Sequence, residues 1–105
     1  MTREELYRVL ASTGIPCAYL EWGAMDPGLP RLVYEEKKSK DFAADDAAAF
    51  RMRRWCVQLY TDGRDEAAEG KVLDAFAEAG VFAGFEPAGA VPGGAHMTAF
   101  YPTTY

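Results

Sequence analysis

One stretch of the chain, from Arg51 to Gly80, limits the possible folds most strongly, because it reads as a strand, a turn and a helix in direct succession. Successive side chains of a strand point to opposite faces, and here the two faces differ in polarity. Three large apolar residues, Trp55, Val57 and Leu59, fall on one face. The opposite face carries Arg54, Cys56, Gln58 and Tyr60. This alternation predicts a long, half-buried strand.

The second part of the stretch predicts a helix with both ends marked. Asp62-Gly63 is a turn signal, and Asp65 can accept hydrogen bonds from the free N–H groups of the first helical turn. Gly80 follows the last periodic position, as a glycine that ends a helix does. The apolar stripe between these ends consists of Ala68, Val72, Leu73, Phe76 and Ala79. We expect this stripe to pack on the apolar face of the strand.

Another helix is predicted at the start of the chain. Thr2 and Glu5 have the spacing of a capping box, in which each side chain bonds the backbone of the other residue. Gly14 ends the helix and Pro16 prevents its return. The apolar stripe of this helix is Leu6, Val9 and Leu10.

Shorter apolar runs predict further strands at residues 17–22, 31–37, 81–85 and 95–101. The first two runs are expected to pair as an antiparallel hairpin. The last two are expected to pair across a flexible, glycine-rich loop at 87–94. Residues 42–46 read as a short strand or an extended arm. Pro102 lacks an N–H group, so the final strand is expected to end, or to lie on a sheet edge, at that residue.

These elements predict one two-layer α+β domain over residues 1–105, with a mostly antiparallel sheet of about five strands and two helices on one face. A hydrophobic content of 50% excludes a disordered chain. The net charge of −5 argues against wrapping of nucleic acid. No apolar run is long enough to cross a bilayer, and no signal peptide opens the chain, so we expect no membrane contact. Cys17 and Cys56 are expected to be reduced thiols, with a disulfide between adjacent strands left open.

The sequence gives no sign of catalytic, cofactor or metal chemistry. The single histidine, His96, falls in a strand pattern and reads as a surface or interface residue. Ser12 and Ser39 have no evident base to activate them. Asp45 and Asp46 have no histidine nearby and read as a solvated turn rather than a metal site. We therefore expect a protein that is not an enzyme and binds no cofactor or metal ion.

A basic cluster and several aromatic residues indicate instead that the surface of the protein contacts other subunits. The cluster consists of Arg51, Arg53 and Arg54, of which the first two share a face with Trp55 and the third faces away. It is either a solvated end of the sheet or a contact with an acidic subunit. The core of so small a domain cannot hold every aromatic residue, and interfaces favour those left outside. The candidates are Trp22, Tyr60, Tyr101 and Tyr105.

The order of several short sequence pieces resembles a known family. The opening Met-Thr-Arg-Glu-Glu-Leu-Tyr is followed by Ser-Thr-Gly-Ile-Pro at 12–16. Further matching pieces lie at 32–34, 41–45, 57–61, 65–66 and 79–82. Together they cover nearly the whole chain and resemble small siphophage and prophage neck and tail proteins, called tail completion, tail terminator or head–tail joining proteins. Gly70 and the segments 87–94 and 102–105 depart from the family pattern.

The resemblance implies a structural virion protein of the tail and neck, without catalysis, that is assembled in the host cytoplasm. Such proteins form a homo-oligomeric ring, usually of six subunits, on the head-proximal end of the tail tube. The ring ends the tube, meets the head connector, and lets DNA through its lumen without specific contact. Two other assignments stay open: a head-side connector adaptor or other minor tail protein, and a small cytosolic α+β ligand-binding or enzyme subunit.

A ring of identical subunits uses two different patches at each contact, so a basic patch can meet an acidic one. We expect the segments 37–46 and 87–94 to project as arms that become ordered against neighbours. The predicted subunit interface pairs the basic cluster with acidic residues of the first arm. Its residues are Asp41, Asp45, Asp46, Arg51, Arg53 and Arg54.

Overall fold

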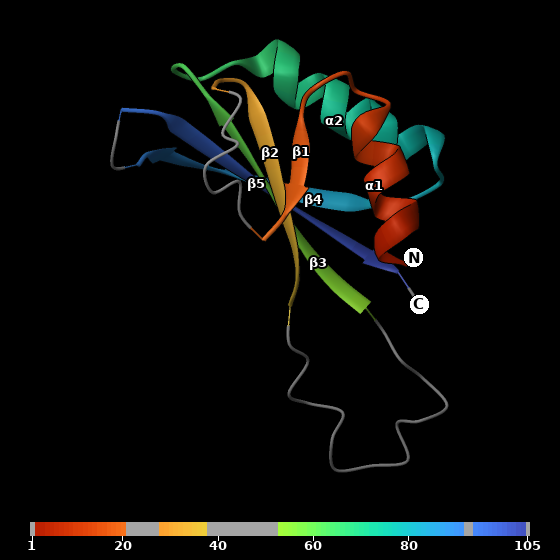
Figure 1. The fold of residues 1–105 in the computed structure, drawn as a ribbon. Helices are drawn as coiled ribbons and strands as arrows, with labels where there is room; N and C mark the ends of the chain where they lie inside the picture. The colour runs from red at the N-terminus through yellow and green to blue at the C-terminus, as the bar shows by residue number, and fades with distance from the viewer. Residues whose placement is uncertain (1, 21–27, 38–52, 92–93, 105) are drawn as a thin grey trace.

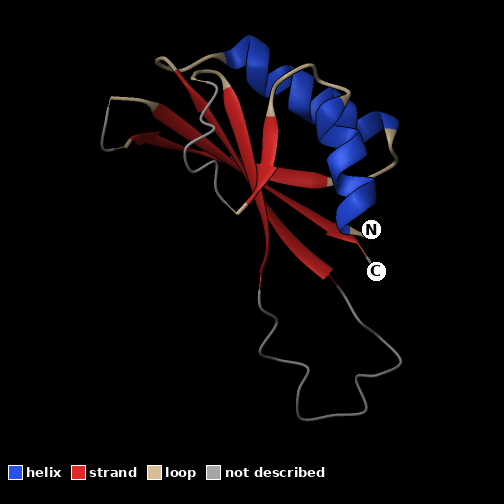
Figure 2. Cartoon of the chain, viewed as in Figure 1, coloured by secondary structure: helices blue, strands red, loops and turns tan. Residues whose placement is uncertain are grey.

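The computed structural model describes residues 2–20, 28–37, 53–91 and 94–104. In chain order its elements are α1 (Arg3–Ala11), β1 (Cys17–Tyr19), β2 (Arg31–Lys37), β3 (Arg53–Thr61), α2 (Glu66–Glu78), β4 (Ala83–Ala90) and β5 (His96–Thr104). The strands form one sheet in the order β1-β2-β3-β5-β4. Only β1 and β2 run parallel, and both helices lie on one face of the sheet (Figures 1 and 2). The predicted two-layer, mostly antiparallel α+β fold is confirmed.

The helix boundaries follow the predicted local signals. In the capping box of α1, the backbone N–H of Glu5 donates to Thr2 Oγ1 at 3.1 Å, and that of Thr2 donates to Glu5 Oε1 at 2.8 Å. Two hydrogen bonds with Thr2 lower the pKa of the Glu5 carboxyl, and the bond with the Thr2 backbone has the larger effect. Because this pKa is lowered in the folded protein, the capping box stabilises the fold at pH values above the ordinary carboxyl pKa. The stabilisation is lost as the pH falls through the lowered pKa.

Helix α2 is closed at both ends by its own sequence. Asp65 Oδ1 accepts from the backbone N–H of Ala68 at 3.0 Å. Past the other end, Gly80 takes a φ of +73°, which a glycine adopts at little cost. This turn lets the Val81 N–H donate to the Phe76 carbonyl at 2.9 Å, a bond that satisfies a carbonyl of the last helical turn.

The core lies between the helices and the apolar face of β3. Trp55, Val57 and Leu59 supply the sheet side, and Val72 and Phe76 supply the α2 side. Leu73, predicted in the same stripe, is only partly buried against this core. The remaining buried members of the cluster are Leu6, Leu10, Ile15, Leu32, Tyr34, Ala68 and Phe100. The predicted packing of the helix stripe on the β3 face is therefore confirmed, except at Ala79, which is exposed beyond the last turn of α2.

The expected antiparallel hairpin between the first two strands is wrong. Strand β1 ends at Tyr19, and the next residue, Leu20, has a left-handed φ of +69°. Strand β2 begins at Arg31 and runs parallel to β1, with Cys17 opposite Leu32. A parallel pair needs a long connection, and this one is long enough to bring the chain back to the start of β1. Sequence periodicity carries no information on that choice of direction.

The predicted loop at 87–94 is wrong for its first half, because β4 continues to Ala90. Pro87 fits there because β4 lies at the edge of the sheet, where a missing N–H group need not cost a ladder bond. The register with β5 shifts between Pro87 and Gly89, and Gly89 has a φ of +86°. A bulge with a glycine in this conformation therefore carries the strand past the proline.

Strand β5 runs past Pro102, whereas the sequence predicted an end or an edge there. It lies between β3 and β4 and continues to Thr104. Its pairs with β3 hold one register on both sides of a gap that skips Trp55 and Cys56. The gap falls opposite Pro102 and Tyr101, where the proline has no N–H group to donate. Two missing pairs are thus tolerated inside a ladder that continues on either side.

Phe76→Ala should destabilise the protein by about 3–5 kcal/mol, because Phe76 is 1% exposed and its loss leaves a cavity under α2. Phe82→Ala is the matched control, since Phe82 is 85% exposed and its truncation should change stability by about 0.5 kcal/mol or less. Urea unfolding of dilute protein measures both. Equal losses for the two variants would show that the core is misplaced.

Candidate functional site

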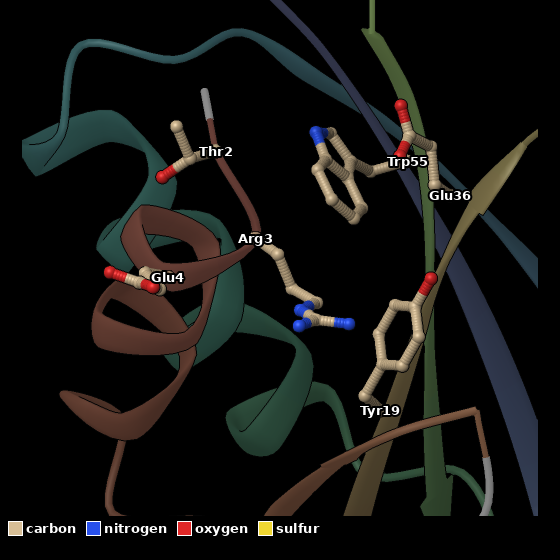
Figure 3. A pocket seen from close by; sticks show the side chains of 6 residues that line it. All are labelled: Thr2, Arg3, Glu4, Tyr19, Glu36 and Trp55. Carbon is tan, nitrogen blue, oxygen red and sulfur yellow. The ribbon is translucent and has the colours of Figure 1, made fainter.

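A hollow of about 350 Å³ opens between the start of α1 and the sheet. Thr2, Arg3 and Glu4 line it from the helix, while Tyr19, Glu36 and Trp55 line it from β1, β2 and β3 (Figure 3). The capping box fixes the first turn of α1 and so determines which side chains meet the strands. This hollow is the candidate site that three strands and a helix build together.

Arg3 is the central side chain of the hollow. Its guanidinium carbon lies 4.7 Å from the centroid of the Tyr19 ring, a cation–π contact that ties α1 to β1 (Figure 3). Tyr19 in turn meets the Tyr34 ring edge-on, with centroids 5.4 Å apart. A second hollow of about 360 Å³ shares Arg3 and Glu4 and continues beside Tyr7, Arg8 and Tyr34. The two hollows form one aromatic and charged groove along α1.

Burial changes the titration of two groups in and near this groove. Burial raises the pKa of the Tyr34 phenol, with a smaller contribution from Cys17, so the phenol stays protonated near neutral pH. Burial likewise raises the pKa of the Cys17 thiol, which keeps the thiolate scarce. Trp55 is 1% exposed, and its Nε1–H has no hydrogen-bond partner within the described part of the chain. The groove therefore offers the Arg3 guanidinium and aromatic surface.

A buried carboxylate joins α2 to β5. Glu69 is 4% exposed, and its Oε2 accepts from the hydroxyl of Thr98 at 2.9 Å. Its Oε1 lies 3.4 Å from Nη2 of Arg64. Glu69 lies in the first turn of α2, where the helix dipole favours negative charge, and this contact was not predicted from the sequence. Its place beside the apolar stripe was the one signal, and it does not reveal a partner 29 residues away.

Thr98→Val should destabilise the protein by about 1–3 kcal/mol, because it removes the donor to a buried carboxylate and preserves the shape of the side chain. Thr98→Ser is the matched control, since it keeps the hydroxyl and loses a methyl group instead. Thermal and urea unfolding of both variants measure the difference. A valine variant as stable as the wild type would remove any role for this contact in holding α2 to β5.

The described residues contain only part of the predicted subunit interface. Arg54 is exposed on β3, and the register places it opposite Lys37 of β2 on the face away from the helices. The backbone of Arg53 pairs with that of Thr104. Two arginines follow one another at this end of β3, and such a basic spot suits an acidic partner. The positions Arg51, Asp41, Asp45 and Asp46 lie outside the described residues, and the arginine–aspartate pairing stays a prediction.

The sheet face away from the helices is mixed in character, and no described helix covers it (Figures 1 and 2). Arg31 lies 4.9 Å over the Tyr60 ring, and the Tyr60 hydroxyl donates to Gln58 Oε1 at 2.9 Å. Burial raises the pKa of Tyr60. Tyr101 on the same face is exposed, as predicted. Trp22 and Tyr105, the other two aromatic candidates, lie outside the described residues.

The remaining reactive side chains form no further cluster in the described part of the chain. His96 is partly buried in β5, opposite Thr61 of β3. Cys17 and Cys56 are not joined in a disulfide and lie on β1 and β3, two strands that β2 separates. The described residues include no group of three or more potential metal ligands. Nor does any described helix combine the length and the apolar character that crossing a membrane requires.

No family model, curated protein or solved structure matches the chain. The resemblance to tail-completion proteins therefore supports a proposal of function and does not establish a family.

Proposed function

We propose that the chain is a structural virion protein that forms a ring of about six subunits at the head-proximal end of a phage tail tube. The ring ends tube growth and joins the tube to the head connector. The order of the sequence pieces that resemble tail-completion proteins supports this proposal. An α+β domain of this size and element order is compatible with it.

The observation that carries the proposal is the amount of aromatic and apolar surface left outside the core. Phe82 is 85% exposed, and Phe85 and Tyr101 are also exposed. One whole face of the sheet lies uncovered by the described helices (Figure 2). Aromatic residues outside a small core are typical of proteins that assemble. This surface favours a subunit of an assembly over a solitary domain.

The charge of the chain is compatible with passage of DNA through a ring. A net charge of −5 leaves the average surface acidic, and such a surface repels the phosphate backbone. The basic spot around Arg53 and Arg54 is the exception. In a ring it can meet acidic side chains of the next subunit, so that the contact sets orientation while apolar burial supplies most of the affinity.

One observation favours a function of another class. The groove along α1 brings the Arg3 guanidinium and the rings of Tyr19 and Trp55 to the same place, as a ligand-binding subunit would. A head-side adaptor, by contrast, would share the surface features given above and would differ only in its neighbours in the virion. Binding of the protein to purified tail tubes, and not to purified connectors alone, separates the adaptor from the tail-completion ring.

Reversing Arg53→Glu and Arg54→Glu together in the phage should leave the subunit folded, because the end of a strand tolerates exchange of one polar residue for another. It should weaken ring formation and give tails that fail to join heads or that have irregular lengths in electron micrographs. Adding Asp45→Lys and Asp46→Lys should restore assembly if these residues are the partners.

The matched control reverses two exposed charges on the helices, Arg8→Glu and Lys71→Glu, and should leave tail length normal. If the Arg53→Glu, Arg54→Glu variant gives infectious particles with normal tails, the basic spot is only a solvated surface and makes no subunit contact.

A further inference from the structure

The sheet has two different outer strands. Strand β1 is at one end of the strand order and β4 is at the other. Within the described residues each of them pairs with a single neighbour, β2 and β5 respectively. Their outward N–H and C=O groups are thus available to another strand. A subunit with two unlike edges can offer both halves of a head-to-tail contact.

Exposed large apolar side chains gather at these two edges. Phe82 directly precedes β4 and Phe85 lies within it. Leu20, which is 56% exposed, directly follows β1. The other exposed large apolar residues that the structure describes are Tyr7 on α1, Leu29 before β2 and Tyr101, which alone sits on the uncovered sheet face. Apolar exposure therefore follows the edges of the sheet more than its open face.

The β4 edge is held in place by the core. Val81 packs partly against the core after the end of α2, and the following Phe82 points away from it. Phe85 stacks on the buried Phe100, with ring centroids 6.0 Å apart. The Phe85 ring is therefore already held by Phe100 in the isolated subunit, which reduces the ordering cost of association.

The usable lengths of the two edges agree. Pro87 and the bulge at Gly89 disturb the second half of β4, so only Ala83–Glu86 remains as a regular edge. The opposite edge, β1, spans only Cys17–Tyr19. Phe85 lies on the helix side of the sheet, because it pairs with Phe100. Tyr19 lies on the same side, because it pairs with the buried Tyr34. In a sheet that continues from one subunit to the next, the Tyr19 and Phe85 rings would therefore lie on the same face.

We propose that the partner at these edges is a second copy of this chain. The Ala83–Glu86 edge of one subunit, with Phe82 and Phe85, docks on the β1 edge of the next, with Leu20, so that the sheet continues from subunit to subunit. The two patches differ, so the contact is heterologous and does not give a two-fold dimer; it closes into a ring when the rotation between neighbouring subunits returns to the first one. This inference rests on the proposed ring function and names the surfaces that build the ring.

Two edge variants test the inference in solution. Phe82→Asp blocks one edge and Leu20→Asp blocks the other, and both positions are exposed, so the subunit should stay folded by circular dichroism. Light scattering should show that the wild type assembles and that each variant alone is a monomer of 11.5 kDa. An equimolar mixture of the two variants should give a two-subunit species, because one intact contact remains possible. Tyr101→Asp, on the open face, should assemble as the wild type does.

Several results would overturn the inference. If both edge variants assemble like the wild type, neither edge takes part in the contact between subunits. A block by Phe82→Asp alone indicates a symmetric contact between two β4 edges. A wild type that stays monomeric at millimolar concentration also contradicts it. The tail-length test with Arg53 and Arg54 does not depend on which edges meet, so the edge model can fail while the proposed function stands.

Discussion

The packing of α2 and α1 on the Trp55, Val57 and Leu59 face of β3 is the contact on which the rest of the structure depends. It buries the largest side chains of the domain and places both helices on one side of the sheet. The same packing leaves the other face and the two outer strands without a described cover. The surface available for assembly is therefore a direct consequence of how the core is made.

Local signals allowed the helices and the long strand to be predicted from the sequence. The capping box at Thr2, the cap at Asp65 and the glycine at position 80 each act within a few residues, and all three are present as expected. Pairing between distant segments was harder to predict. The parallel direction of β1 and the extension of β5 past Pro102 depend on partners far along the chain. The preference of proline for strand ends and edges concerns a single residue, whereas many backbone pairs hold the β3–β5 ladder on either side of Pro102.

The surface was predictable only in part, for a similar reason. The arginines of β3 can be recognised from their charge, and Arg54 is indeed exposed. Phe82, in contrast, belongs to an apolar run that reads as a buried strand, and its exposure depends on the turn that ends α2. Glu69 shows the opposite case, a charged residue that the fold buries and satisfies with Thr98. Burial is decided by tertiary placement, and single residue types do not encode it.

The central claim is that this chain forms the ring that ends a tail tube. The most direct measurement is the native mass of the purified protein, alone and mixed with purified tail-tube protein, together with electron microscopy of the mixture. The account predicts a closed ring of about six copies that caps one end of the tubes and stops their growth. A monomer that ignores the tubes and leaves their length distribution unchanged would contradict it.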